Sequence, residues 1–251
     1  MIGNAIEVIS IKGIPLVDDG DDISDLILAA IKKNAQKLQK GDILVISHKI
    51  ISKSESKVHS ITEITPSSIA KKIAQKSGQS EKKVEVALQE SIHVIREEPI
   101  LITQTKQGFI TDYSGIDQSN APEGTFVALP ENPDSSARTI HQKISKQAGF
   151  NIPVIITDTQ GRPWRRGAVN LAIGLAGMTP FTKNEGRLDL YGKKIRSSLV
   201  CLADEIAAAA ELVMGQADEK IPAVIVRGIQ FKSEDGNANS ILRDQSENFF
   251  L

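Results

Sequence analysis

Residues 151–170 read NIPVIITDTQGRPWRRGAVN, and the interpretation of the whole chain starts from this stretch. Pro153–Thr157 is a short apolar run rich in β-branched residues, a composition typical of a buried strand. The polar residues 158–161 follow, and we expect a turn there in which Gly161 gives the backbone its freedom. The pattern therefore predicts that a rigid strand holds Asp158 at its end, where the carboxylate can face a ligand or solvent.

Oxygen donors and guanidinium groups are concentrated in the same stretch. Thr157 and Thr159 flank Asp158, and three arginines follow: Arg162, Arg165 and Arg166. Oxygen ligands beside several guanidinium groups suit a divalent metal and a polyphosphate. A strand followed by a polar turn with solvated arginines is the alternative, and spacing alone does not separate the two interpretations.

Composition narrows the class of protein. The chain has 251 residues, of which 40% are hydrophobic and 24% charged, as is usual for a globular protein. Its net charge is -1, and it lacks the excess of basic residues that a nucleic-acid-binding protein normally has. No apolar run reaches the roughly 18 residues of a membrane span. The single Cys201 cannot form an internal disulfide and suggests an inert core thiol. The N-terminus lacks the pattern of a signal peptide. We expect a cytoplasmic protein without a nucleic-acid or membrane partner.

Apolar periodicity and turn residues outline the elements. The predicted strands are Ala5–Ile11, Ile43–Ser47, Ile100–Thr105, Gly108–Thr111, Thr125–Leu129, Leu171–Met178 and Ala223–Arg227. The predicted helices are Ile23–Gln36, one that begins at Thr65-Pro66, one capped by Ser80 that includes Ile92, one from Asn132-Pro133 to Gly149, and Ser198–Gly215. Strands and helices mix without regular βαβ alternation, which favours an α+β fold with mixed or antiparallel sheets over a Rossmann fold. We expect one module over residues 1–251, with two closely packed subdomains as the alternative.

Two glycines in Leu171–Met178 suggest a strand that another backbone approaches closely, and this segment would suit packing against a second subunit. Asp204 and Glu211 lie two turns apart on the last predicted helix, and we interpret them as a solvated stripe. His141 borders an apolar helix face and is interpreted as a histidine at the edge of the core.

Three polar clusters follow apolar segments, at 115–120, 157–161 and 215–218. Their Asp, Thr and Gln oxygens suit magnesium or manganese rather than zinc. Magnesium commonly uses one or two carboxylates together with nucleotide phosphates, so scattered single aspartates are a plausible site. The chain contains no GxxxxGK[ST], GxGxxG or GxSxG motif, so a nucleotide would bind outside the familiar glycine loops, P-loop included.

An ordered set of motifs spans the chain from about Ile11 to Gly228. The motifs are GIPLV, HKIISK, GIDQSN, ITDTQGRPWRRG, RLDLYG, LADEIAAAAELVMGQAD and PAVIVRG. Each is weak alone, but in this order they resemble the coenzyme F-420:L-glutamate ligase family, the gamma-glutamyl ligases of the deazaflavin cofactor.

The resemblance implies an unusual α+β ligase fold that assembles as a homodimer. It also implies a reaction in which GTP and Mg²⁺ or Mn²⁺ are used to join L-glutamate to the phospholactate carboxyl of the deazaflavin precursor. Further γ-linked glutamates can follow, and a monovalent cation such as K⁺ is a further candidate cofactor. We expect no fused flavin domain, because the chain ends too soon for one.

The resemblance also assigns residues. The implied metal ligands are Asp117, Asp158, Thr159 and Gln216. The implied nucleotide contacts are Ile14, Pro15, Leu16, Val17, His48, Lys49, Lys53, Asn120 and the loop of Met214, Gly215, Gln216, Ala217, Asp218, Glu219, Lys220 and Ile221.

The residue chemistry fits such a ligase. Phosphoryl transfer to a carboxylate gives an acyl phosphate that an amine can attack, and the transfer depends mainly on positioning and charge neutralisation. Asp117 and Asp158 would supply metal oxygens, and Lys53 and Arg162 cations. The alternatives are a metal-dependent phosphohydrolase or kinase for another phosphorylated small molecule, and an RNA-binding regulatory module that uses the arginines.

Overall fold

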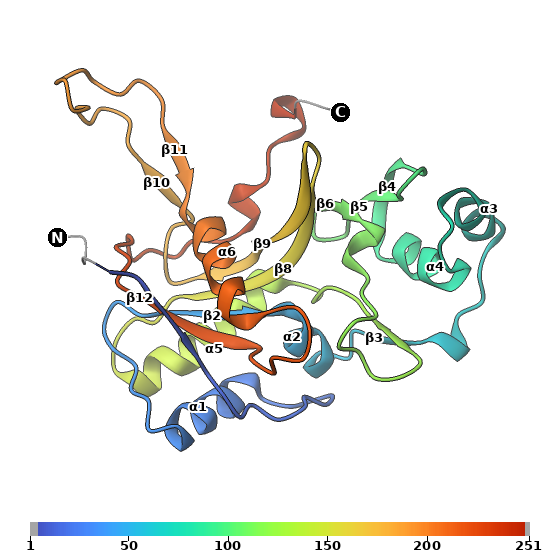
Figure 1. Cartoon of the computed structure of the whole chain (residues 1–251), viewed down its shortest axis with the longest axis horizontal. Helices are drawn as coiled ribbons and strands as arrows, with labels where there is room; N and C mark the ends of the chain where they lie inside the picture. Colours follow the sequence, from blue (N-terminus) through green and yellow to red (C-terminus); the bar gives the residue numbers. More distant parts are fainter. Residues whose placement is uncertain (1–4, 249–251) are drawn as a thin grey trace.

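The fold is built on a five-stranded mixed sheet, seen at the centre of the computed structural model in Figure 1. The structure describes residues 5–248. The sheet order is β1 (Glu7–Ser10), β12 (Ala223–Arg227), β2 (Ile43–Ser47), β8 (Val154–Arg162) and β9 (Arg165–Ala176). Only β2 and β8 are parallel, and the other neighbouring pairs are antiparallel.

Helices cover both faces of this sheet. One face packs against α1 (Ile23–Lys33), α2 (His48–Ser54) and α5 (Pro133–Ala148), and the other packs against α6 (Leu202–Met214). Successive β2 residues alternate between the two cores: Leu44 and Ile46 face the first group, and Ile43 and Val45 face α6. Because β2 is covered on both sides, its sequence is a continuous apolar run rather than an alternating one.

A third core lies beside the main sheet. It is formed by α3 (Ser68–Ser77), α4 (Glu81–Gln89) and two small antiparallel sheets, one of β3 (Val58–Ser60) with β7 (Thr125–Val127) and one of β4 (Ser91–Arg96), β5 (Ile102–Thr105) and β6 (Ile110–Asp112). Short 3-10 helices occupy Ile61–Glu63, Tyr113–Gly115, Asn239–Ile241 and Gln245–Glu247. Figure 1 shows this unit, with α3 and α4, to one side of the main sheet.

A two-stranded arm, β10 (Phe181–Lys183) with β11 (Leu199–Cys201), reaches away from the body in Figure 1. The loop between its strands carries three exposed apolar side chains, Leu188, Leu190 and Tyr191. Within residues 5–248, no helix is long and apolar enough to cross a membrane.

The α+β prediction is confirmed, and several elements match closely. The predicted strands at 43–47 and 223–227 are β2 and β12. Helix α5 begins after Asn132, whose side-chain oxygen accepts a hydrogen bond from Ser135 N–H at 3.0 Å, and ends at Gly149 in the left-handed region. The hairpin predicted over 100–111 is β5–β6.

Four local predictions were wrong. The turn predicted at 158–161 is strand, because β8 continues to Arg162 in pairing with β9, and Gly161 has open space around it. Residues 199–201 pair with β10, so α6 begins at Leu202 and not at Ser198. Ser67, whose Oγ accepts the Ala70 N–H, caps α3 in place of Thr65. Helix α4 ends at Gln89, which leaves Ile92 exposed on β4.

The close backbone approach predicted for the glycine-containing strand is confirmed at Gly174. A Cβ on Gly174 would lie 2.5 Å from the carbonyl oxygen of Pro133, at the start of α5. The same strand is buried within its own chain, with Leu175 and Ala176 both fully covered. Its burial leaves the segment unavailable for the second subunit that we had considered for it.

We therefore expect Gly174→Ala to destabilise the protein by about 1–3 kcal/mol, the usual range for overpacking a tight core. The added methyl group has to displace α5 or β9. Urea unfolding measures the change, and Gly161→Ala is the matched control, because no heavy atom lies within 4 Å of a Cβ built there. Equal losses in the two variants would contradict the steric argument.

Candidate functional site

Two consecutive side chains at the start of α2 contact the two predicted metal-binding aspartates. His48 Nε2 lies 3.2 Å from Asp158 Oδ1, and Lys49 Nζ lies 2.6 Å from Asp117 Oδ2. Asp158 belongs to β8 of the main sheet, whereas Asp117 lies between the 3-10 helix Tyr113–Gly115 and β7. Helix α2 therefore links both parts of the candidate site.

Asp158 is held in place from several sides. Its Oδ1 accepts the Thr159 N–H at 2.8 Å, and its Oδ2 accepts a hydrogen bond from the Gln160 amide at 3.2 Å. His48 is almost completely buried, and its other ring nitrogen lies 3.2 Å from Ser52 Oγ. The His48 ring therefore faces Asp158, and the nucleotide contact expected at His48 stays a prediction.

Asp117 is ionised over the whole physiological range. Burial opposes its ionisation, but hydrogen bonds from the Lys49 ammonium and from Ser119 outweigh burial and lower the pKa of Asp117 to about 2. Ser119 contributes both its backbone N–H, at 2.8 Å, and its hydroxyl, at 2.9 Å. Lys49 also donates to Ser119 Oγ at 2.8 Å, so the lysine, the serine and the carboxylate form one cluster.

The segments predicted to contact the nucleotide are joined around Lys53 and Asn120. Lys53 Nζ donates to the Asn120 carbonyl at 2.7 Å, and the Asn120 amide donates to the Ala217 carbonyl at 3.0 Å. Burial and the nearby Lys49 ammonium lower the pKa of Lys53. The loop after Ile14–Val17 is tied to the end of α2 by the Gly20 N–H, which donates to the Ser54 carbonyl at 3.0 Å.

Thr159 and Gln216, the other two predicted metal ligands, are in direct contact. The Gln216 amide nitrogen donates to Thr159 Oγ1 at 2.8 Å and to Glu211 Oε1 at 2.7 Å. Glu211 Oε2 accepts the Asn170 N–H on β9 at 3.1 Å, and Asp204 accepts the Ala172 N–H at 2.9 Å. The interpretation of Asp204 and Glu211 as a solvated stripe is therefore wrong, because both cap the edge strand.

Arg162 is bonded to backbone carbonyls of its own hairpin. It lies near the tip of the β8–β9 hairpin, where its guanidinium donates to the carbonyls of Gly167 at 3.2 Å and of Arg166 at 3.0 Å. The hydrogen bonds described for Arg162 thus tie it to its own hairpin, and the structure gives its predicted catalytic role no support.

The donors present suit a hard divalent cation. Asp117 and Asp158 offer carboxylate oxygens, and Thr159 and Gln216 offer a hydroxyl and an amide oxygen. Over residues 5–248, no three His, Cys, Asp or Glu side chains are grouped so that they could hold a metal. A site with two carboxylates requires further oxygens from the substrate, which is how magnesium is usually held beside nucleotide phosphates.

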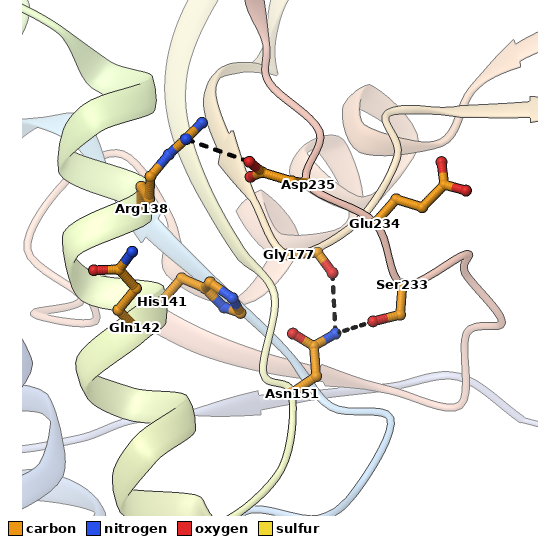
Figure 2. Close-up of a pocket in the computed structure, with 8 residues that line it drawn as sticks. All are labelled: Arg138, His141, Gln142, Asn151, Gly177, Ser233, Glu234 and Asp235. Atoms are coloured by element: carbon orange, nitrogen blue, oxygen red, sulfur yellow. Dashed lines mark hydrogen bonds and ion pairs between the residues drawn. The ribbon is translucent and has the colours of Figure 1, made fainter.

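A separate cavity of about 350 Å³ lies between α5 and residues 233–235 (Figure 2). The predicted site residues do not line it. Arg138 pairs there with Asp235 at 3.3 Å, and the Asn151 amide donates to Gly177 O and Ser233 Oγ, so several of its polar groups are already engaged. His141 Nδ1 lies 2.8 Å from Ile152 O, which confirms its role at the edge of the core.

Two contacts of the site were not predicted from the sequence. The pairing of His48 with Asp158 follows from the register in which β2 and β8 pair, where Ser47 lies opposite Thr157. The contact between Glu211 and Gln216 could have been suspected, because Gln216 follows a helix end five residues after Glu211. The inert thiol was predicted: burial raises the pKa of Cys201 to about 12.

Comparisons with known proteins identify the family of the chain. The family model described as F420-0:Gamma-glutamyl ligase matches residues 12–228. The chain is 43% identical to the coenzyme F420:L-glutamate ligase of Methanothermobacter thermautotrophicus, over 98% of each chain. The ligase of that name from Methanopyrus kandleri is 41% identical over 98% of each chain, and that from Archaeoglobus fulgidus is 39% identical over 96% and 95%.

Fold and matches together define a ligase of the α+β class. Within that class, the chain belongs to the coenzyme F420:L-glutamate ligase family.

The Lys49–Asp117 contact predicts a measurable pKa. We expect Asp117 to titrate at about 2, so that its contribution to stability is present above the unfolded value of 3.8 and is lost as the pH falls through about 2. Carboxyl NMR titration measures it. Lys49→Met should raise this pKa, whereas the control Lys53→Met, which removes an ammonium bonded to Asn120 O, should change it much less. An unchanged pKa in Lys49→Met would disprove the assignment.

Proposed function

We propose that this protein joins L-glutamate to the phospholactate carboxyl of the deazaflavin precursor of coenzyme F420, with GTP as the phosphoryl donor. The proposal rests on the meeting of three polar segments at α2. His48 contacts residues 158–159, and Lys49 and Lys53 contact residues 117–120. Residues 216–217 are joined to Asn120 and to Thr159 by hydrogen bonds. The relatives that match along nearly the whole chain are named coenzyme F420:L-glutamate ligase, which supports glutamate as the substrate that is joined.

The Lys49 and Lys53 ammonium groups of the site already have partners within the protein. Lys49 neutralises Asp117, and Lys53 is bonded to the loop carbonyl of Asn120. A divalent cation held by Asp117, Asp158, Thr159 and Gln216 would neutralise phosphate charge. Lys49, which lies 2.6 Å from Asp117, would be available to the nucleotide phosphates when Asp117 serves as a metal ligand, and Lys53 lies beside the two loops assigned to nucleotide binding.

The proposed reaction has two steps. A substrate carboxylate oxygen attacks the γ-phosphorus of GTP, the bond to the bridging oxygen breaks, and GDP leaves. The glutamate amine then attacks the acyl carbon, the carbon–oxygen bond breaks and inorganic phosphate leaves. The amine proton passes to solvent or phosphate, so the reaction needs no histidine base. Positioning and charge neutralisation are the main contributions expected of the protein.

A coupled turnover assay tests the function. GTP, Mn²⁺, L-glutamate and the deazaflavin–phospholactate precursor are incubated with the protein, with and without K⁺, and the products are read by mass spectrometry. We expect products heavier by glutamyl units. Asp158→Asn should lose more than about a hundredfold in rate, since metal charge stabilisation contributes several kcal/mol. Asp235→Asn, in the cavity of Figure 2, is the control and should retain activity.

The side products separate the alternatives. GDP that forms only when both glutamate and the precursor are present supports the ligase. GTP hydrolysis without a glutamyl product would instead favour a metal-dependent phosphohydrolase, and phosphoryl transfer to another acceptor would favour a kinase. A folded protein that neither forms a glutamyl product nor consumes GTP would contradict the proposed function.

We further propose that the protein is a homodimer whose contact includes the arm. Leu188, Leu190 and Tyr191 are 62%, 101% and 88% exposed, an unusual grouping of apolar side chains unless something covers them. Sedimentation equilibrium should give twice the 27.2 kDa chain mass. Replacing the three residues with serine should yield a monomer, whereas Leu212→Ser, at an equally exposed position on α6, should not. A monomeric wild type would refute this arrangement.

A further inference from the structure

The Gln216 side chain belongs to a closed ring of hydrogen bonds. Gln216 donates to Glu211 and to Thr159, and Thr159 Oγ1 in turn donates to Asn170 Oδ1 at 2.6 Å. The Asn170 backbone N–H closes the ring on Glu211 Oε2. The members come from β8, β9, α6 and the loop after α6, so the ring fixes an otherwise exposed glutamine relative to the sheet.

Glu211 determines which way the Gln216 amide faces. With the amide reversed, its oxygen would lie about 2.7 Å from a carboxylate oxygen, an arrangement of two acceptors without a proton between them. The nitrogen must therefore face Glu211. Because nitrogen and oxygen are bonded to the same carbon and point in different directions, the amide oxygen is turned away from Glu211 and is free to accept a cation.

We propose that Glu211 is a positioning residue for a cation site: it fixes the Gln216 amide so that the oxygen, not the nitrogen, faces the bound divalent cation. This inference rests on the proposed function, in which Gln216 is a metal ligand. Glu211 acts through Gln216 and through Asn170. Groups that orient metal ligands in this way typically change metal affinity by 10–100-fold when they are removed.

Asp204 provides a control that distinguishes a positioning role of Glu211 from a purely structural one. It lies seven residues before Glu211 on α6 and caps the Ala172 N–H at 2.9 Å, as Glu211 caps the Asn170 N–H at 3.1 Å. No hydrogen bond described for Asp204 involves Gln216. If capping the edge strand were the only role of these carboxylates, the two alanine variants would behave alike.

The experiment titrates each purified variant with Mn²⁺ in the presence of GDP. The electron paramagnetic resonance signal of free Mn²⁺ is followed, and binding in a protein-free GDP solution is subtracted. We expect Glu211→Ala to weaken Mn²⁺ binding about tenfold or more, and Asp204→Ala to leave it near the wild-type value. Circular dichroism verifies that both variants are folded at the temperature used. Equal affinities in wild type and Glu211→Ala, or equal losses in the two variants, would overturn the proposal.

The Gln216→Glu background provides a second test, because both oxygens of a carboxylate can face a cation and no orientation has to be selected. We expect Glu211→Ala to weaken Mn²⁺ binding much less in the Gln216→Glu background than in the wild-type background. An equal loss in the two backgrounds would count against the proposal. A wild type that binds no Mn²⁺ would overturn the metal site of the proposed function as well, so the two failures are distinguishable.

Discussion

The parallel pairing of β2 with β8 is the constraint on which the site depends. Its register places Ser47 opposite Thr157, so the residues that follow, His48 and Asp158, meet at the same end of the sheet. Helix α2 begins there without a connecting loop, and successive helical side chains point in different directions. His48 therefore turns inward to β8 while Lys49 reaches Asp117. A shift of this register by one residue would separate His48 from Asp158.

At the β9 edge of the sheet, carboxylates rather than another strand accept the free backbone N–H groups. Strand β9 is the last in the sheet, and its backbone N–H groups at Asn170, Ala172 and Leu175 are accepted by Glu211, Asp204 and Asp134. Hydrogen bonds to charged groups are worth about 1.5–3 kcal/mol each, and blocked donors prevent pairing with another chain. Asp134 also accepts the Ala238 N–H at 2.7 Å, so one side chain joins α5, the sheet edge and the C-terminal segment.

The sequence predicted those parts of the fold whose signal is local. Asn132 and Gly149 at the ends of α5 act within one turn, and the apolar run of β2 reports burial on both faces. Predictions were wrong where a distant partner decides the conformation. Leu199–Cys201 is strand because β10 lies beside it, and residues 158–161 remain strand because β9 pairs with them, although their polar composition is typical of a turn.

The site divides in the same way. Motif order predicted Asp158, Thr159 and Gln216 as metal ligands, and the contact between Thr159 and Gln216, which lie 57 residues apart in sequence, fits that grouping. Periodicity placed Asp204 and Glu211 on one helix face, yet it carries no information on what lies opposite that face. A helix position and an exposed charge do not reveal that a strand edge supplies N–H donors there. Glu211 thus meets two constraints that only the folded structure brings together: it caps the sheet edge at Asn170, and it orients the amide of the glutamine beyond the helix.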